Sequence, residues 1–275
     1  LKIAVVGRPN VGKSSLANRL LSAERLIVAD QPGTTRDSIE VPFRLGSGAE
    51  ARSAVLIDTA GMRPVRRIDS AVERYGLFRA QAGIERADLC ALVIDGAQGP
   101  TAQDKKVADA ILTARKGCVV VVNKWDRLRG VASRQEYEEA LWRAVPFLAF
   151  APAVFVSAAT GWNVSGVIET LARVAAAVAQ PLPTGPLNRC LLDAYTRKAP
   201  PLIGGKRWKL YYAAQVGTNP QRIILFVNDP QRLPAAYESY LFAAIRRKFE
   251  LPGAPLQFIL KPRIQSKPVF FKKDT

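Results

Sequence analysis

The 275-residue sequence contains no histidine. This absence excludes imidazole acid–base chemistry, a Ser-His-Asp triad and zinc sites with histidine ligands. Only three cysteines are present, and none has the C-x-x-C spacing of a metal or redox pair. We interpret Cys90, Cys118 and Cys190 as small core residues of a protein kept in a reducing compartment.

Acidic residues are scarce relative to basic ones. Asp and Glu total 23 against 40 Lys and Arg, which gives a formal net charge of +17. Residues 181–275 contain 16 basic and 5 acidic side chains, a net charge of +11 in the last third of the chain. A surplus of this size predicts an anionic partner, and we favour the phosphate backbone of a nucleic acid over a solvated surface.

Long uninterrupted hydrophobic runs are missing as well. The apolar run after Lys2 ends at Gly7, which is too early for a secretory signal. Residues 144–168 carry no charge, but prolines and glycines such as Pro146, Pro152 and Gly161 interrupt them. We interpret this stretch as a strand, a loop and the start of a helix, and we expect a cytoplasmic protein with no membrane partner.

Short β-rich apolar runs alternate with helical patterns through residues 1–180. The expected strands are Ile3–Val6, Ala54–Ile57, Leu89–Ile94, Val119–Val122 and Ala153–Val156, and the expected helices are Lys13–Leu21, Ser70–Glu85, Ala102–Arg115, Gln135–Ala144 and Val167–Val178. Continuous apolar strands are typical of a parallel sheet that helices cover on both faces. The pattern predicts an α/β domain with a doubly wound sheet.

The pattern changes after residue 180. Residues 181–186 are rich in Pro and Gly and suggest a linker. Residues 187–263 suggest a small α+β domain in the order α-β-β-α-β, and residues 264–275 a basic tail.

A phosphate-binding loop is predicted at Gly7–Ser14, which matches G-x-x-x-x-G-K-[ST] between a strand and a helix. Its glycines allow backbone N–H groups to surround phosphates at a helix N-terminus. Lys13 would reach the β- and γ-phosphates, and the Ser14 hydroxyl would ligate Mg²⁺. Asp58, at the end of a second strand, can also hold Mg²⁺. Gly61 allows its backbone N–H to approach the γ-phosphate. In a switch loop at residues 32–37, a threonine hydroxyl can complete the set of Mg²⁺ ligands.

A guanine site is predicted by Asn123-Lys124-Trp125-Asp126 after a third strand. The Asp126 carboxylate can accept hydrogen bonds from guanine N1–H and the exocyclic amine, a donor pair that adenine lacks. Ser157-Ala158-Ala159, after the next strand, could close over the base edge through a backbone N–H.

Together these motifs resemble those of Era-like TRAFAC GTPases. Lys209–Thr218 and Leu225–Pro230 further resemble the C-terminal KH-like domain of the EngA (Der) family of ribosome-assembly GTPases, whose members carry two G domains before it. The resemblance implies a P-loop GTPase domain (the second of the two, with a first expected upstream) that hydrolyses GTP to GDP with Mg²⁺ and contacts rRNA of the large ribosomal subunit. The implied nucleotide-binding residues are Gly7, Asn10, Val11, Gly12, Lys13, Ser14, Ser15, Asp58, Gly61, Asn123, Lys124, Asp126, Ser157, Ala158 and Ala159; the implied Mg²⁺ ligands are Ser14, Thr35 and Asp58, and the catalytic residues Lys13, Thr35 and Gly61.

Two alternatives to this function remain open. One is an Era-type GTPase with an RNA-reading KH domain, although no G-x-x-G loop is present and the nearest sequence is Gly204-Gly205-Lys206-Arg207. The other is an RNA scaffold that binds nucleotide with negligible hydrolysis.

GTP hydrolysis also needs a positive charge that offsets the negative charge on the phosphates in the transition state. Met62 stands where many GTPases have a water-orienting glutamine. Asn10 could help to hold K⁺ beside the phosphates, as in related potassium-activated GTPases. Alternatively, Asn10 only stabilises the loop, and Arg8, Arg36 or an arginine of a partner supplies the charge.

Overall fold

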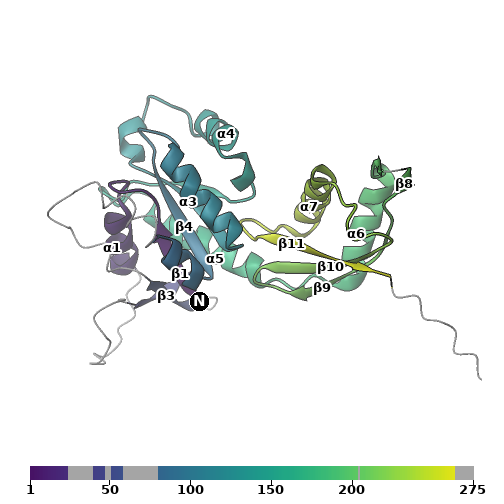
Figure 1. Ribbon diagram of the computed structural model, residues 1–275. Helices are drawn as coiled ribbons and strands as arrows, with labels where there is room; N and C mark the ends of the chain where they lie inside the picture. The colour runs from purple at the N-terminus through teal and green to yellow at the C-terminus, as the bar shows by residue number, and fades with distance from the viewer. Residues whose placement is uncertain (24–39, 47–50, 58–79, 204, 264–275) are drawn as a thin grey trace, which may run out of the picture. The chain divides into compact units, whose positions relative to one another are not determined.

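The computed structural model describes residues 1–23, 40–46, 51–57, 80–203 and 205–263 (Figure 1). These residues form two compact units. Unit 1 contains residues 1–180 together with 251–255, and unit 2 contains residues 181–250 and the chain from residue 256 onward.

Unit 1 is built on a six-stranded sheet in the order β2-β3-β1-β4-β5-β6. The strands are β1 (Lys2–Val6), β2 (Val41–Leu45), β3 (Arg52–Ile57), β4 (Leu89–Asp95), β5 (Gly117–Asn123) and β6 (Ala153–Phe155). All neighbouring pairs are parallel except β2 and β3, which are antiparallel. Because parallel strands end at the same edge, the residues that follow β1, β4, β5 and β6 gather there.

Helices cover both faces of this sheet (Figure 1), as the sequence predicts. The helices with complete bounds are α1 (Lys13–Ala23), α3 (Ala102–Thr113), α4 (Arg134–Ala144) and α5 (Val164–Ala179). Helix α3 begins with a capping box, in which the Thr101 side chain accepts from the Asp104 N–H and the Asp104 carboxylate accepts from the Thr101 N–H. Every residue of β4 and β5 is buried, which accounts for their continuous apolar sequences.

The segment at residues 144–168 begins at the last residue of α4 and forms β6, a loop and the start of α5, as expected, and it also contains a 3₁₀ helix, η4 (Pro146–Leu148), which was not predicted there. Among the described residues, no helix combines the length and apolar character that crossing a membrane requires.

Unit 2 has the predicted α-β-β-α-β order. Helices α6 (Thr184–Arg197) and α7 (Ala235–Phe249) accompany a three-stranded sheet of β9 (Leu210–Gly217), β10 (Gln221–Val227) and β11 (Leu256–Pro262). The order is β11-β10-β9, with β10 parallel to β11 and antiparallel to β9. A short hairpin of β7 (Leu202–Ile203) and β8 (Lys206–Arg207) precedes this sheet.

Two details differ from the sequence-based expectations, and a third expectation is covered only in part by the described residues. Strand β2 was not among the expected strands. It contains Pro42, and its position at the sheet edge makes the missing N–H of this proline tolerable. Helix α6 begins at Thr184, inside the stretch expected to be a linker. Residues 80–86 are helical, whereas the first part of the predicted helix Ser70–Glu85 lies outside the described residues.

Candidate functional site: a nucleotide site at the carboxyl edge of the sheet

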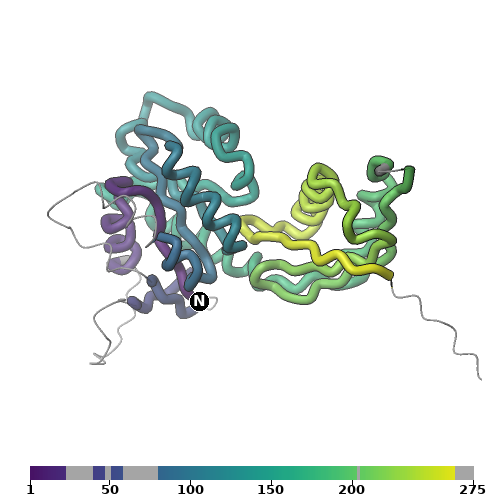
Figure 2. The backbone as a smooth tube through the Cα atoms, viewed as in Figure 1, coloured from purple at the N-terminus to yellow at the C-terminus, as the bar shows by residue number. Residues whose placement is uncertain are grey.

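The chain turns tightly between β1 and α1 (Figure 2), and this loop, residues 7–12, is called the cradle. Gly7, Asn10 and Gly12 have φ angles of 147°, 64° and 97°. A Cβ atom on Gly7 would lie 2.4 Å from the Val93 carbonyl oxygen, and one on Gly12 would lie 2.2 Å from Asn123 Nδ2. Both glycines are therefore required by close packing as well as by their backbone conformation.

The Lys13 side chain crosses this cradle. Its Nζ donates to the Arg8 carbonyl oxygen at 2.7 Å, while Gly12 O accepts from Leu16 N at 2.9 Å as α1 begins. Lys13 is thus at the mouth of the loop, where an ammonium can meet phosphate oxygens. Ser14 is half-buried in the first turn of α1, and Ser15 is exposed.

The Asn123 side chain joins three of the predicted motifs. Asn123 is 2% exposed at the end of β5. Its Nδ2 donates to the Val11 carbonyl oxygen at 2.8 Å, and its Oδ1 accepts from the Ala158 N–H at 2.9 Å. One buried amide therefore fixes the phosphate loop and the Ser157–Ala159 loop relative to each other.

Lys124 makes a second connection to the phosphate loop. Its backbone is left-handed, with φ 62°, and its Nζ donates to the Asn10 carbonyl oxygen at 2.8 Å and to Asp95 Oδ2 at 2.6 Å. Burial raises the pKa of Asp95, but the hydrogen bond and charge of Lys124 outweigh that effect, so the pKa is lowered. The carboxylate is therefore ionised and holds Lys124 in place.

Asp126 lies in the 3₁₀ turn η3 (Trp125–Leu128), directly after this lysine. The Trp125 ring anchors the turn: it is 4% exposed, and its centroid lies 4.5 Å from that of Phe155 and 5.3 Å from that of Tyr137. Asp126 is exposed beside a cavity of about 430 Å³ lined by Trp125, Asp126, Arg129, Ser157, Thr160, Gly161 and Trp162. The cavity is connected to the phosphate loop through Asn123, which bonds Val11 and the Ala158 N–H next to Ser157. An aspartate at the wall of such a cavity can read the polar edge of a base.

Three family models match parts of the chain. Residues 2–124 match the model of a 50S ribosome-binding GTPase, and residues 77–200 match the GTP-binding domain of elongation factor Tu. Residues 182–261 match the C-terminal KH-domain-like model of EngA bacterial GTPases. The chain is 45% identical over 264 residues to GTPase Der of Caldanaerobacter subterraneus subsp. tengcongensis, and 43% identical over 264 residues to that of Desulforudis audaxviator, with 96% of this chain covered in both.

The chain belongs to the EngA (Der) family.

The chain spans 59% of the length of these EngA relatives. Among solved structures, Era of Aquifex aeolicus is 19% identical, with a TM-score of 0.46 and coverage of 95% of this chain and 93% of that one.

The EngA motifs of the sequence analysis are largely brought together by the structure. Gly7, Asn10, Val11, Gly12, Lys13, Ser14 and Ser15 form the cradle and the start of α1, and the side chains of Asn123 and Lys124 contact it. Asp126 and Ser157 line the adjacent cavity, and Ala158 and Ala159 follow it in the chain. The remaining predicted residues, Thr35, Asp58 and Gly61, lie outside the described residues, as do Arg36 and Met62.

Two polar residues that contact the predicted motifs were not identified from the sequence. Asp95 ends the buried strand β4 and pairs with Lys124, and an aspartate at the end of an apolar run is a signal that could have identified it. Arg19 projects from α1, and its guanidinium donates to the carbonyl oxygens of Ala158 and Ala159 at 3.3 and 2.9 Å. An arginine in a helix after a phosphate loop gives no such signal in the sequence.

A third contact bears on Arg8, which was one candidate source of positive charge. Arg8 Nε lies 3.2 Å from Oδ2 of the fully buried Asp104, and Nη2 donates to Gln98 Oε1 at 2.6 Å. Both contacts direct the guanidinium to the N-terminus of α3. In this structure Arg8 is therefore engaged with α3 and is not extended over the cradle.

Proposed function

We propose that this chain binds GTP and hydrolyses it to GDP as a switch in assembly of the large ribosomal subunit, with unit 2 contacting rRNA. The Asn123 side chain is the observation that carries the proposal, because it couples the phosphate loop to the loop beside the base cavity. In such a site the Asn123 side chain fixes the loop for the phosphates relative to the loop for the base, which suits a purine nucleoside triphosphate. Asp126 at the cavity wall supports guanine.

The nucleotide would enter together with Mg²⁺. The loop fits phosphates, because its glycine-rich backbone leads directly into the N-terminus of α1, and a Cβ at Gly7 or Gly12 would displace Val93 or Asn123, which pack against it. Ser14 would ligate the metal, with Thr35 and Asp58 as the further ligands that the family resemblance implies. Mg²⁺ would supply positive charge to the β- and γ-phosphates, and Lys13 would add its own after leaving the Arg8 carbonyl.

An Era-type function is less well supported. The segment most similar to a G-x-x-G loop is residues 204–207. Its described part lies in the turn and the second strand of the β7–β8 hairpin. A KH loop that clamps RNA has a different setting, in which backbone groups grip four nucleotides. The match of residues 182–261 to the EngA-type domain also favours the first function.

Nucleotide competition and turnover test the proposal. GTP should displace a fluorescent GDP analogue from the chain, whereas a 100-fold excess of ATP should not. Phosphate release should be slow for the chain alone and faster with large ribosomal subunits, and Lys13→Ala should abolish it. Equal displacement by ATP would contradict the guanine assignment. Tight GTP binding without turnover, even with ribosomal subunits, would identify the nucleotide-binding RNA scaffold instead.

A further inference from the structure

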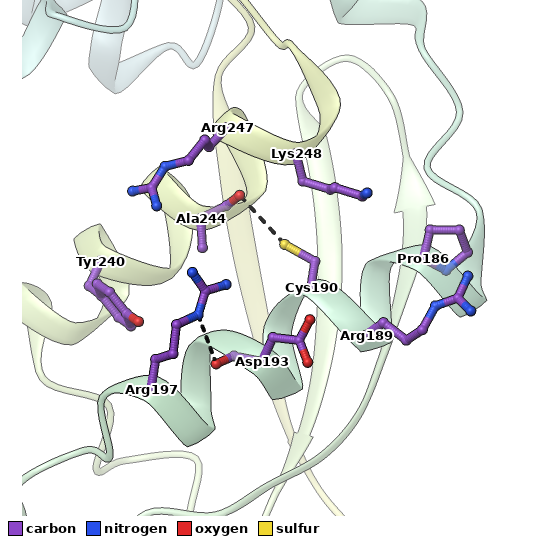
Figure 3. Close-up of a pocket in the computed structure, with 9 residues that line it drawn as sticks. All are labelled: Pro186, Arg189, Cys190, Asp193, Arg197, Tyr240, Ala244, Arg247 and Lys248. Carbon is purple, nitrogen blue, oxygen red and sulfur yellow. Dashed lines mark hydrogen bonds between the residues drawn. The ribbon is translucent and has the colours of Figure 1, made fainter.

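Unit 2 contains a basic hollow between its two helices, α6 and α7. It measures about 650 Å³, and its lining residues are Pro186, Arg189, Cys190, Asp193, Arg197, Tyr240, Ala244, Arg247 and Lys248. Figure 3 shows that side chains from both helices surround it. Four of the nine residues are cationic and one is acidic, so the hollow has a formal charge of +3.

Two uncharged residues that line the hollow already have hydrogen-bond partners. Cys190 Sγ contacts the Ala244 carbonyl oxygen at 3.5 Å, and the Tyr240 hydroxyl donates to the Ala194 carbonyl oxygen at 2.9 Å. Burial raises the pKa of the Cys190 thiol, with a smaller effect of the same sign from Asp193. Cys190 and Tyr240 therefore add no charge to the hollow, and Asp193 is the one acidic residue among its lining residues.

The four cations are available to a ligand. Within the described part of the chain, none of Arg189, Arg197, Arg247 and Lys248 forms an ion pair. Arg197 donates through Nε to the Asp193 carbonyl oxygen at 3.3 Å (Figure 3), and its two terminal nitrogens make no hydrogen bond with the described residues. Guanidinium groups that are exposed and unpaired around a concave surface are well suited to phosphate.

Helix stabilisation explains only part of this arrangement. Arg197 lies in the last turn of α6, and Arg247 and Lys248 lie in the last turn of α7, where positive charge interacts favourably with the helix dipole. Arg189 lies in the first half of α6, where the dipole does not favour it. Arg189 and Arg197 lie eight residues apart on one face of α6, a rise of about 12 Å along the helix, so these two arginines can meet phosphates that are not adjacent along a nucleic acid strand.

We propose that the hollow between α6 and α7 binds the phosphate backbone of RNA. This inference rests on the proposed function, because it names the surface through which unit 2 makes its RNA contact. Backbone contacts of this kind fix position without reading sequence, which suits a unit that has no G-x-x-G loop. Asp193 stands between two arginines and weakens the site for anions.

The opposite face of the unit 2 sheet provides a matched control. Ile223, Leu225 and Val227 of β10 are buried and alternate with Arg222, which is exposed on the other face. Lys261 pairs with Phe226 across β10 and β11 and therefore shares that face with Arg222. Arg222→Gln with Lys261→Gln removes two charges from unit 2 without changing the hollow.

The test measures anisotropy of a fluorescein-labelled 20-nucleotide oligouridylate with the full chain at 50 to 200 mM KCl. Arg197→Gln with Arg247→Gln should weaken binding about tenfold and reduce the slope of log K against log salt by about 1.4, which corresponds to two single-strand phosphates. Asp193→Asn should strengthen binding. The Arg222→Gln, Lys261→Gln control should change affinity less than twofold.

Several outcomes would overturn the proposal. If the control pair weakens binding as much as the hollow pair does, the attraction is spread over unit 2 and the hollow is not the site. A polyglutamate of equal charge that binds more tightly than RNA, and loses affinity in the same variants, would identify an acidic protein segment as the occupant. Binding of RNA that is unaffected in both hollow variants would refute the site but leave the proposed function intact, whereas no binding by the unaltered chain would refute the RNA contact itself. Retained GDP binding and an unchanged melting temperature would verify that the variants are folded.

Discussion

Asp126 is the residue on which base selection depends. Replacing it with asparagine converts one acceptor oxygen into an NH₂ donor, which opposes the amine of guanine and suits the carbonyl that xanthine has in its place. Because a buried or enclosed polar mismatch is penalised strongly, Asp126→Asn should reduce GTP affinity by at least about 100-fold and raise XTP affinity. Competition of GTP and XTP against a fluorescent GDP analogue measures both. Unchanged GTP affinity in the variant would contradict the role of Asp126.

Asn10 is the residue on which the source of transition-state charge depends. Its left-handed backbone, with φ 64°, and the Lys124 contact to its carbonyl oxygen place it on the turn of the phosphate loop. Arg8 is held by Asp104 and Gln98, which favours a bound cation over this arginine as the source of charge. GTP hydrolysis should therefore be roughly tenfold or more faster in KCl than in NaCl at equal ionic strength.

The control for this prediction is Asn10→Ala. The variant should lose the difference between the two salts while it still binds GDP. Equal rates for the unaltered chain in K⁺ and Na⁺ would rule out the cation.

At the scale of elements, Gly253 connects the segment at residues 251–255 to the rest of unit 1. It accepts from the Cys118 N–H at 2.9 Å and donates to the Phe150 carbonyl oxygen at 2.8 Å. Its φ is 66°, and an added Cβ would lie 2.4 Å from the Cys118 carbonyl oxygen. Gly253→Ala should therefore lower the free energy of unfolding by about 1–3 kcal/mol, as measured by urea denaturation.

Gly185 offers the matched control for this substitution. It lies in α6, and an added Cβ there meets no atom within 4 Å. Gly185→Ala should be neutral or stabilising by about 0.5–1 kcal/mol. Similar destabilisation by both substitutions would show that Gly253 has no special role.

Helix α4 is connected to the nucleotide edge through Tyr137, whose hydroxyl donates to the Gly96 carbonyl oxygen at 3.0 Å. Burial, assisted by the charges of Asp95 and Asp104, raises its pKa from 10.0 to about 12. Between these values the unfolded chain releases this proton and the folded chain retains it, so stability falls as the pH rises from 10 to 12. The melting temperature should decline more steeply in this window for the unaltered chain than for Tyr137→Phe. Parallel curves would contradict the prediction.

For the whole molecule, the net charge of +17 predicts that RNA binding depends strongly on salt. Four single-strand phosphate contacts correspond to a decrease in affinity of about 50-fold between 50 and 200 mM salt. Filter binding of the oligouridylate across this range measures the slope, and GDP binding should change far less. A flat response would contradict binding through the phosphate backbone.

Much of the fold could be predicted from the sequence because its signals are local. Apolar runs such as Val119–Val122 and Leu89–Ile94 predict buried parallel strands, and the structure confirms both as central strands of the sheet. Strand β2 could not be predicted in this way, since its proline is acceptable only at a sheet edge, and the position of a strand within a sheet is not a local property.

The sequence by itself determined the residue types and the order of the motifs: the phosphate loop, the Asn-Lys-x-Asp segment and the strand ends that carry them. These depend on spacing along the chain, which is visible without a structure. Only the tertiary structure decided which partners these residues have. The deciding contacts join residues that are 29 to 112 positions apart in the sequence. They are the hydrogen bonds of Asn123 with Val11 and Ala158, the ion pair of Lys124 with Asp95, and that of Arg8 with Asp104. Such contacts arise from the order and register of strands across the sheet, and no local pattern encodes that order.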